Sequence, residues 1–349
     1  MRRHPGFLNT LQEQIENLDV GILTRISKHG GLDISDLISF LLEPKDHTVD
    51  FPEVVESHEL FQHAQLQDYT DLGKQLVEKN CIAVCLLAGG AGTRAGGPKC
   101  LMKIFNNETL LSLKLKQLKD IKHIWILVTE DLAEEVRQHL NEKELLRDGI
   151  ELITQYESLR LLPDNQLLLI DDKPSLYPCG HGDVIPALIN SNTLNKFCNS
   201  GGKHMVVMNV DNILANVDFS ILGLHHANNT PITCEIVKKI PADKGGVLCR
   251  HMGINQIVEE YRLSPETDLT KFEYINTNTM IINTDLNFDT ITWRWHRVKK
   301  IINHSAVIQY ERLLQQLTEH FKTQFVEVNR AQRFSPIKSA SDLDKLKIA

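Results

Sequence analysis

A run of apolar residues that opens directly into a glycine-rich loop is the feature that most constrains this chain. Residues 81–87 read Cys-Ile-Ala-Val-Cys-Leu-Leu, a pattern typical of a strand buried on both faces of a parallel sheet. Glycine lets a backbone approach a ligand closely, and successive N–H groups in a glycine-rich loop converge on a phosphate. Because Arg94 and Lys99 add positive charge at a strand's carboxyl end, we predict phosphate binding here rather than a plain surface turn. The loop glycines are Gly89, Gly90, Gly92, Gly96 and Gly97.

The spacing within this loop excludes two familiar phosphate-binding motifs. A Walker loop needs Ser or Thr after its Gly-Lys pair, whereas Lys99 follows Pro98 and precedes Cys100. The dinucleotide fingerprint needs a third glycine where Ala95 stands, followed by a helix that Pro98 blocks. What remains is Gly-Gly-x-Gly-Thr-Arg followed by Pro-Lys, which resembles the nucleotide loop of sugar-1-phosphate nucleotidyltransferases.

Composition bounds the class of protein. The 349 residues are 42% hydrophobic and 24% charged, the balance of an ordinary globular chain. The net charge of −7 argues against a nucleic-acid partner. No apolar run approaches the roughly 20 residues that span a bilayer, and no apolar signal core follows the N-terminus, so we expect a cytoplasmic protein without a membrane partner. The seven scattered cysteines contain no C-x-x-C pair and suggest neither a disulfide framework nor a zinc site.

Hydrophobic periodicity divides the chain into three parts. Residues 1–80 read as a helical segment, with apolar positions at helical spacing from 8 to 22 and a short helix at 33–42. Residues 81–290 alternate strands with helices, which predicts an α/β core with a mainly parallel sheet. Residues 291–349 form the C-terminal part of the same, catalytic domain. The strands are expected at 123–128, 150–154, 167–170, 204–210, 232–237 and 279–283, and the helices at 110–121 and 132–145, the second capped by Asp131.

The C-terminal part combines a basic cluster with a predicted helix. Residues 294–300 read Arg-Trp-His-Arg-Val-Lys-Lys, which is either a solvated face or a surface that helps to hold a polyanion. Apolar residues from Val307 to Phe321 recur at helical spacing, so we expect an amphipathic helix there. The segment 333–338, Arg-Phe-Ser-Pro-Ile-Lys, lies close to the end of the sequence.

Two further loops carry residue types that bind ligands. In Tyr-Pro-Cys-Gly-His-Gly-Asp, residues 177–183, glycines flank His181, and Asp183 is placed to cap the next helix. The apolar strand at 206–210 ends in Asp211, and a carboxylate at a strand end suits Mg²⁺, which leaves its other positions to phosphates and water. Taken singly, these loops are equally explained by a loop-to-helix turn and an Asx turn.

The last motifs combine amides with a carboxylate. Alternation of Asn276 and Asn278 on an apolar strand places both amides on one face. With Glu259 they offer both donors and acceptors to sugar hydroxyls. Lys244 and Gly246 precede them in a Lys-Gly-Gly turn, and taken singly these pieces also fit hairpin chemistry and a polar sheet edge.

In this order the motifs resemble those of the UDP-glucose pyrophosphorylase (UTP–glucose-1-phosphate uridylyltransferase) family, from about Ala83 to Leu346. The resemblance implies a Rossmann-like, GT-A-like nucleotidyltransferase core with Mg²⁺ as cofactor and with UTP and glucose 1-phosphate as substrates. UMP passes to the sugar phosphate, and pyrophosphate leaves. The family's C-terminal β-helix has no counterpart in this sequence, so we expect a short form that is a monomer or a small homo-oligomer.

The resemblance also implies roles, carried over by position. Uracil and ribose are assigned to the loop Leu87, Ala88, Gly89 and Gly90, and to Gln155. The nucleotide and the substrate phosphates are assigned to Gly180 and His181, and Mg²⁺ is assigned to Asp211. The sugar side is assigned to Asn209, Lys244, Gly246, Glu259, Asn276 and Asn278. The charge of the reacting phosphates is assigned to Lys99, Arg94 and Lys338, which with Asp211 form the catalytic set.

Two departures from the family pattern keep alternatives open. The connection from Gly-Thr to Pro-Lys, residues 94–97, is shorter than the family usually has, which displaces Lys99. Arg94 is more typical of UDP-N-acetylhexosamine and broad-specificity enzymes, whereas Gly-His-Gly-Asp favours UDP-glucose. The alternatives are therefore a UDP-N-acetylglucosamine or broad-specificity UDP-sugar pyrophosphorylase, and a catalytically silent nucleotide-sugar-binding protein.

Overall fold

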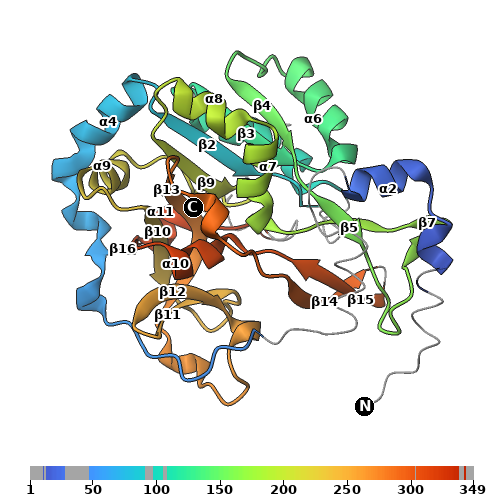
Figure 1. The fold of residues 1–349 in the computed structure, drawn as a ribbon. Coiled ribbons are helices and arrows are strands. Elements are labelled where there is room, and N and C mark those ends of the chain that lie inside the picture. The colour runs from blue at the N-terminus through green and yellow to red at the C-terminus, as the bar shows by residue number, and fades with distance from the viewer. Residues whose placement is uncertain are drawn as a thin grey trace.

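A mixed sheet forms the centre of the molecule (Figure 1). The computed structural model describes residues 11, 13–27, 47–90, 97–104, 108–302, 304–337 and 342. The strands of the sheet are, in spatial order, β1 (Phe61–Gln62), β16 (Thr323–Glu327), β10 (Ile232–Lys238), β13 (Tyr274–Asn283), β9 (His204–Asn209), β2 (Ile82–Leu87), β3 (His123–Val128) and β4 (Ile150–Thr154).

Most strand pairs in this sheet are parallel. β2 pairs in parallel with both β3 and β9, and β10 pairs in parallel with β16. β13 runs antiparallel to β10 and β9, and β11 (Gly246–His251) and β12 (Ile254–Glu259), which extend the same sheet beside β13, are also paired antiparallel. Residues 82–86 of β2 are completely buried, as the apolar run predicts. The mainly parallel α/β core is therefore confirmed, and the carboxyl ends of β2 and β9 meet at the same edge.

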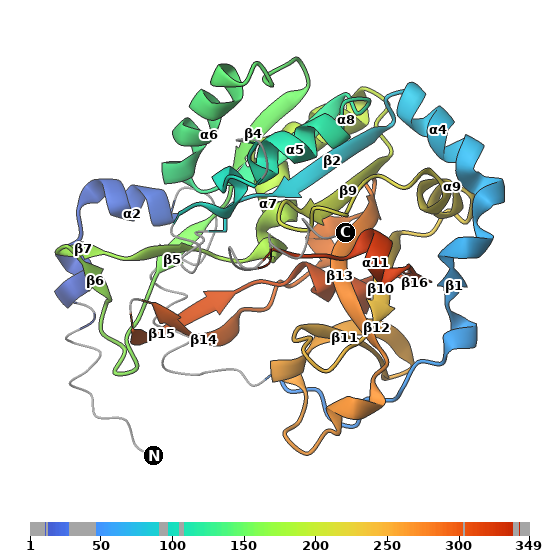
Figure 2. The same cartoon turned by 180° about the vertical axis from the view of Figure 1, so that it is seen from behind.

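Helices cover both faces of the sheet (Figures 1 and 2). The alternation of side chains along β2 divides the core: Ile82, Val84 and Leu86 point to one apolar layer, while Ala83 and Cys85 point to the other. The first layer contains residues of α4 (Thr70–Glu78), α5 (Leu110–Gln117), α6 (Glu130–Glu142) and α9 (Phe219–Ala227). The second contains residues of α7 (Val184–Asn190), α8 (Thr193–Asn199) and α10 (Leu317–His320).

The N-terminal helical segment is held by apolar packing of Leu11, Ile15 and Ile26 and by polar contacts. The expected helical run at 8–22 is broken within its described part, because residues 13–16 are helical and α2 (Val20–Ser27) begins anew; the expected helix at 33–42 lies outside the described residues. Arg25 donates to Glu157 at 2.8 Å and to Asp131 at 2.7 Å. Asp131 therefore does not cap α6, whose N-cap residue is Thr129.

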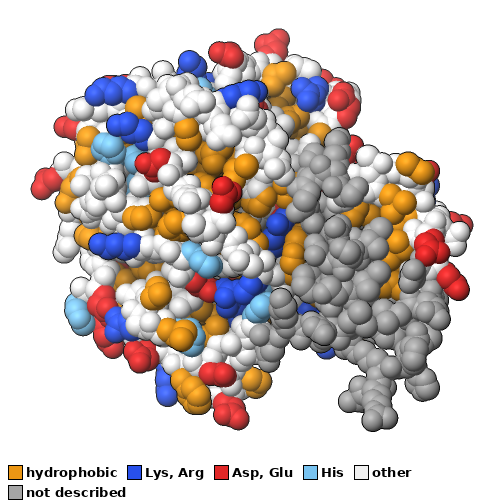
Figure 3. All heavy atoms as spheres, viewed as in Figure 1, with side chains coloured by type: hydrophobic (Ala, Val, Ile, Leu, Met, Phe, Trp, Pro, Cys, Tyr) orange, Lys and Arg blue, Asp and Glu red, His pale blue; other side chains and the backbone are white. Residues whose placement is uncertain are grey.

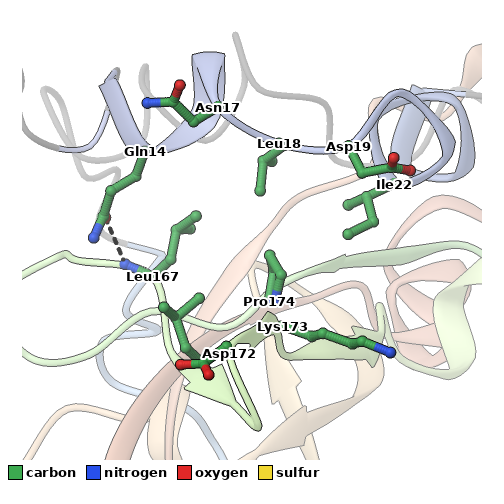
Figure 4. Close-up of a pocket in the computed structure, with 10 residues that line it drawn as sticks. Gln14, Asn17, Leu18, Asp19, Ile22, Leu167, Asp172, Lys173 and Pro174 are labelled. Atoms are coloured by element: carbon green, nitrogen blue, oxygen red, sulfur yellow. Dashed lines mark hydrogen bonds between the residues drawn. The ribbon is translucent and has the colours of Figure 1, made fainter.

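A small subdomain of short strands joins α2 to the sheet. Here β5 (Glu157–Leu159) pairs with β8 (Leu176–Pro178), and β6 (Leu169–Ile170) pairs with β7 (Lys173–Pro174). The strand expected at 167–170 is thus only partly confirmed and does not belong to the central sheet. Gln14 accepts a hydrogen bond from the backbone N–H of Leu167 at 3.0 Å, across a cavity of about 740 Å³ (Figure 4).

The predicted helix at 307–321 is wrong. Residues 305–311 form β15 (Ser305–Glu311), which pairs with β14 (His296–Ile302), and helical structure is confined to a 3₁₀ turn at Leu314–Gln316 and to α10. The segment is rich in β-branched and aromatic residues that suit a strand, and long-range pairing decides its structure. The backbone of Leu161 pairs with Ile308 on the free side of β15.

A second hairpin lies beside β13. It is formed by β11 (Gly246–His251) and β12 (Ile254–Glu259), with Gly246 directly opposite Glu259. In the described part of the chain no helix is both long enough and apolar enough to cross a bilayer. On the face drawn in Figure 3, cationic and anionic side chains are interspersed over the described surface.

Candidate functional site

Two adjoining cavities lie at the carboxyl ends of β2 and β9. The first, the loop cavity, has a volume of about 240 Å³ and is lined by the start of the glycine-rich loop and by Pro178–His181. The second, the hairpin cavity, has a volume of about 650 Å³ and is lined by the start of β11, the end of β12 and the centre of β13. Both are lined by Lys99, Asn209, Asp211 and Lys300, which we call the seam. They therefore form one cleft.

The loop cavity begins where β2 ends. Leu87, Gly89 and Gly90 line it, as does Gln155 directly after β4. A Cβ atom at position 89 would collide with the Gln155 side-chain amide, so in this arrangement the amide lies directly against the glycine. Ala88 does not line either cavity; its buried N–H donates to the carbonyl of Leu127 at 2.9 Å.

His181 enters the loop cavity as a neutral hydrogen-bond donor. Its Nδ1 accepts the backbone N–H of Leu314 at 2.9 Å, which leaves the proton on Nε2. Burial, and then the nearby charge of Lys300, lower the pKa of His181 to about 4. Gly180 precedes it with a φ of +94°, and a Cβ there would lie 2.6 Å from the carbonyl oxygen of Arg312.

Asp183 holds this loop by a buried ion pair rather than by capping. It occupies the N-cap position of α7, but its side chain makes no capping hydrogen bond. Instead, Arg312 Nε donates to its Oδ1 at 2.6 Å, and the guanidinium group lies 4.3 Å from the ring centre of Trp295. Burial raises the pKa of Asp183 while Arg312 opposes that rise. The predicted cap is therefore wrong because a partner distant in sequence takes the carboxylate.

We predict that Arg312→Met lowers the free energy of unfolding by about 3–5 kcal/mol, because it leaves a fully buried carboxylate unpaired. Chemical denaturation measures the change. Adding Asp183→Leu should restore much of the loss, since the pair is then replaced by apolar groups. Arg297→Met, at an exposed position on β14, is the matched control. A double variant as unstable as the sum of the two single variants would contradict this assignment.

At the seam, a lysine and a carboxylate form an ion pair. Lys99 Nζ donates to Asp211 Oδ2 at 2.8 Å. Asp211 Oδ1 is buried and has no hydrogen-bond partner among the described residues. The second lysine, Lys300, pairs with Glu311, and both line the loop cavity.

The segment before residue 338 is attached to the loop that carries Asp211. The N–H of Ile337 donates to the carbonyl of Asp211 at 2.9 Å, and Asn212 exchanges hydrogen bonds with Ser335 and Arg333. Arg333 in turn forms a buried ion pair with Glu235 of β10. Two predicted site residues, Arg94 and Lys338, lie outside the described residues.

The hairpin cavity brings together the remaining predicted residues, which are Lys244, Gly246, Glu259, Asn276 and Asn278. A bulge in the pairing of β10 with β13 puts Asn278 at a φ of +59°. Asn276 Nδ2 then donates to Asn278 Oδ1 at 2.7 Å, so the two amides do lie together as predicted. Burial and the neighbouring carboxylates of Glu260 and Glu311 raise the pKa of Glu259 to about 7.

Several residues of the cleft were not found from the sequence. Lys300 belongs to the basic cluster 294–300, and only its position at the seam distinguishes it from the other cations of that cluster. Glu311 and Gln315 fall in the segment misread as a helix, so no signal pointed to them. Gln315 Nε2 donates to Glu259 Oε1 at 2.7 Å.

The larger cavity beside α2 does not share these features. It is lined by Asp19 and Asp172, with Lys173 as a cation (Figure 4). A polyanion is better accommodated at the seam, where Lys99 and Lys300 lie together.

Comparisons with known proteins identify relatives of this chain. A family model described as UTP–glucose-1-phosphate uridylyltransferase matches residues 37–347. A probable UTP–glucose-1-phosphate uridylyltransferase of Schizosaccharomyces pombe is 30% identical over 313 residues, covering 79% of this chain and 62% of the relative. The corresponding protein of Encephalitozoon cuniculi is 28% identical over 314 residues, covering 81% and 61%. The chain thus spans less than two thirds of the length of these relatives.

Solved structures share the fold. A UDP-glucose phosphorylase of Trypanosoma brucei superimposes with a TM-score of 0.73 at 20% identity, over 97% of this chain and 78% of the other. A putative UDP-N-acetylglucosamine pyrophosphorylase of Entamoeba histolytica gives 0.75 at 20% identity, over 85% and 86%.

Proposed function

The chain belongs to the UTP–glucose-1-phosphate uridylyltransferase family, and from that premise we propose that it transfers UMP from UTP to glucose 1-phosphate. The observation that carries the proposal is the meeting of two cavities at a seam with Lys99, Asp211 and Lys300. The nucleotide is assigned to the loop cavity and the sugar to the hairpin cavity, so that their phosphates face each other at the seam.

The reaction needs electrostatic support more than a base. A phosphate oxygen of the sugar 1-phosphate forms a bond to the α-phosphorus of UTP, and the bond from that phosphorus to the bridging oxygen breaks to release pyrophosphate. The attacking phosphate monoester is already largely dianionic at neutral pH, since its second pKa is about 6. The protein must therefore bring anions together and stabilise the leaving pyrophosphate, the task assigned to Lys99 and Lys300.

Arg94 and Lys338 are proposed to add cations to the same phosphates. The family resemblance supports both assignments. For Lys338, the hydrogen bond from the adjacent Ile337 to the carbonyl of Asp211 gives further support.

The walls of the loop cavity suit a nucleoside. The Gln155 amide lies against Gly89 and offers a donor and an acceptor to the uracil edge. The neutral His181 is proposed to donate from Nε2 to a phosphate oxygen. Leu87, Gly90 and Gly180 supply backbone close to the base and ribose, whereas Ala88 lies behind them, bonded to Leu127.

The seam also suits Mg²⁺. A buried carboxylate oxygen without a partner, Asp211 Oδ1, is a ligand of the kind that Mg²⁺ takes singly from a protein while it keeps water and substrate phosphates. Bound there, the ion would neutralise phosphate charge. Asp211 is proposed to hold it, with Lys99 beside the second carboxylate oxygen.

In the hairpin cavity, the proposal predicts a pH dependence of sugar binding. Glu259 accepts a hydrogen bond from a sugar hydroxyl fully only when its carboxyl group is ionised. Because its pKa is about 7, this group takes up a proton as the pH falls through neutrality. We expect the KM for glucose 1-phosphate to rise by up to about tenfold from about pH 8 to about pH 6. Glu259→Gln should flatten this profile, and steady-state kinetics measure it. The substrate phosphate titrates equally in assays of the wild-type protein and of Glu259→Gln, so the difference between their pH profiles of KM reports on Glu259. Identical profiles would rule out this role for Glu259.

The test of the proposed function is pyrophosphate release from UTP, CTP, GTP and ATP with a panel of sugar 1-phosphates. Release that requires UTP and is fastest with glucose 1-phosphate supports the proposal. Preference for N-acetylglucosamine 1-phosphate, or equal use of several sugars, would replace it by the corresponding UDP-sugar pyrophosphorylase. UTP binding in a calorimeter without release with any sugar would instead indicate a silent nucleotide-sugar-binding protein.

A further inference from the structure

We propose that Gln315 sets the hydrogen-bond polarity of the hairpin cavity, so that the cavity selects a sugar phosphate by a free hydroxyl facing Glu259. This inference rests on the proposed function, because it takes a hexosyl phosphate as the ligand of that cavity. Gln315 does not line the cavity; it acts as a positioning residue through Glu259 and Asn278.

Gln315 is a buried amide held firmly behind the sugar side of the cleft. The residue is 3% exposed, and its backbone carbonyl accepts a hydrogen bond from Thr318 Oγ1 at 2.7 Å. Its side-chain Oε1 is buried without a hydrogen-bond partner among the described residues, so the side chain is oriented through Nε2. Its Nε2 lies 2.7 Å from Glu259 Oε1 and, in a longer contact, 3.5 Å from Asn278 Oδ1. One amide nitrogen thus faces two acceptors that belong to different elements, β12 and β13.

Close packing fixes the carboxylate in this arrangement. Gly246 stands opposite Glu259 on the neighbouring strand β11. A Cβ atom at position 246 would collide with Ile257 Cγ2 at 2.5 Å and would lie 3.2 Å from Glu259 Oε1. The glycine therefore allows β11 to pack closely against β12 beside the carboxylate.

The hydrogen bonds within this network determine which donors and acceptors remain for a ligand. Gln315 occupies Glu259 Oε1, and Oε2 makes no hydrogen bond to another described residue. Asn278 Oδ1 accepts from Asn276 Nδ2, while Asn276 Oδ1 accepts the backbone N–H of Asn278 at 3.0 Å. Both amide oxygens are thus used within the network. Around Gln315, this network presents Glu259 Oε2 as its carboxylate acceptor and the remaining amide N–H groups as donors.

A hydroxyl group matches this set because it donates and accepts at once. It can donate to Glu259 Oε2 and accept from an amide N–H. A sugar that lacks the hydroxyl leaves both groups unpaired, which costs more than an exposed hydrogen bond is worth. Without Gln315, the carboxylate is free to turn and the Asn278 amide to reverse, so the discrimination depends on Gln315.

The experiment compares Gln315→Leu with Gln316→Leu. Gln316 is equally buried, but its amide bonds to the carbonyl of Thr292 and the N–H of Arg294, away from the cleft. For Gln315→Leu we expect the KM for glucose 1-phosphate to rise about tenfold while the KM for UTP stays within about twofold. Gln316→Leu should leave both constants unchanged, even where its melting temperature falls equally.

Singly deoxygenated glucose 1-phosphates supply the second readout. With the wild-type protein, loss of one particular hydroxyl should lower kcat/KM by about tenfold or more. In Gln315→Leu the same loss should cost about threefold or less, because the groups that read the hydroxyl are no longer held. A wild-type protein that discriminates against none of the deoxy sugars would overturn the inference, even if the Leu variant fails to fold.

A charge-bearing variant gives an opposite pH trend. Gln315→Glu places a second carboxyl group against Glu259, so sugar binding should be weak at about pH 8 and improve toward about pH 6, where a shared proton restores the donor. The wild-type protein is expected to change in the reverse direction. Parallel trends in the two proteins, or an unchanged sugar KM in Gln315→Leu, would refute the role of Gln315. If wild-type protein releases no pyrophosphate with any sugar, the proposed function fails instead.

Discussion

Lys99→Ala is expected to reduce kcat for pyrophosphate release by about 10²–10³-fold, with little change in stability. Lys99 lines both cavities, and its Nζ lies 2.8 Å from Asp211 Oδ2, at the point where the two substrates' phosphates are proposed to meet. A fixed cation there stabilises charge that is concentrated in the transition state, so kcat rather than KM should carry the effect. The side chain is about a quarter exposed, so its truncation creates no buried cavity.

Single-turnover kinetics with saturating UTP and glucose 1-phosphate measure this change. Lys103→Ala, an exposed lysine a few residues further along the same loop, is the matched control and should turn over normally. Near-normal turnover by Lys99→Ala would remove Lys99 from the catalytic set. It would also show that the short connection before Pro98 displaces the lysine from the reacting phosphate.

Asp211→Asn is expected to lower kcat by about a hundredfold or more and to weaken the dependence of the rate on Mg²⁺. The amide keeps the shape of the carboxylate but loses the charge that pairs with Lys99 and that is proposed to hold a divalent cation. Turnover measured over a range of Mg²⁺ concentrations should therefore saturate much later than in the wild-type protein.

The control for this variant is Asp285→Asn, an exposed aspartate that follows β13 at the opposite edge of the sheet. The double variant Lys99→Ala with Asp211→Asn should lose far less than the product of the two single effects, because both residues act on the same phosphates. If the losses of kcat in the two single variants were fully additive in the double variant, Lys99 and Asp211 would have independent roles. If Asp211→Asn left the Mg²⁺ dependence unchanged, the metal would have to be held by other ligands.

The parts of the fold that were predictable are those with a local signal. The apolar run at 82–86 predicts a buried central strand, and the glycine-rich loop that follows it in sequence lies at the carboxyl end of that strand. From the order of the motifs, Gln155, Asp211 and Glu259 were expected at one cleft, and the structure brings them to its walls. Their roles with substrate remain predictions.

The errors have a common cause in long-range partners. Asp131 and Asp183 look like helix caps in sequence, but Arg25 and Arg312, both more than 100 residues away, take their carboxylates. Val307 to Phe321 has helical spacing of apolar residues, yet pairing with β14 makes its first part a strand. Periodicity within a short window does not register such pairing. For the same reason Gln315, in that segment, could not be assigned to the sugar side.

The β14–β15 hairpin supplies Lys300 and Glu311 to the wall of the cleft, and the 3₁₀ turn after it places Gln315 directly behind Glu259. This wall stands apart from the central sheet and is docked on the loop at 180–183. The residues proposed to contact phosphate and to position the sugar-binding carboxylate therefore belong to one contiguous stretch of the sequence. A chimera that exchanges this stretch with a relative is expected to transfer substrate preference in one step, while the loops proposed to bind the base stay unchanged.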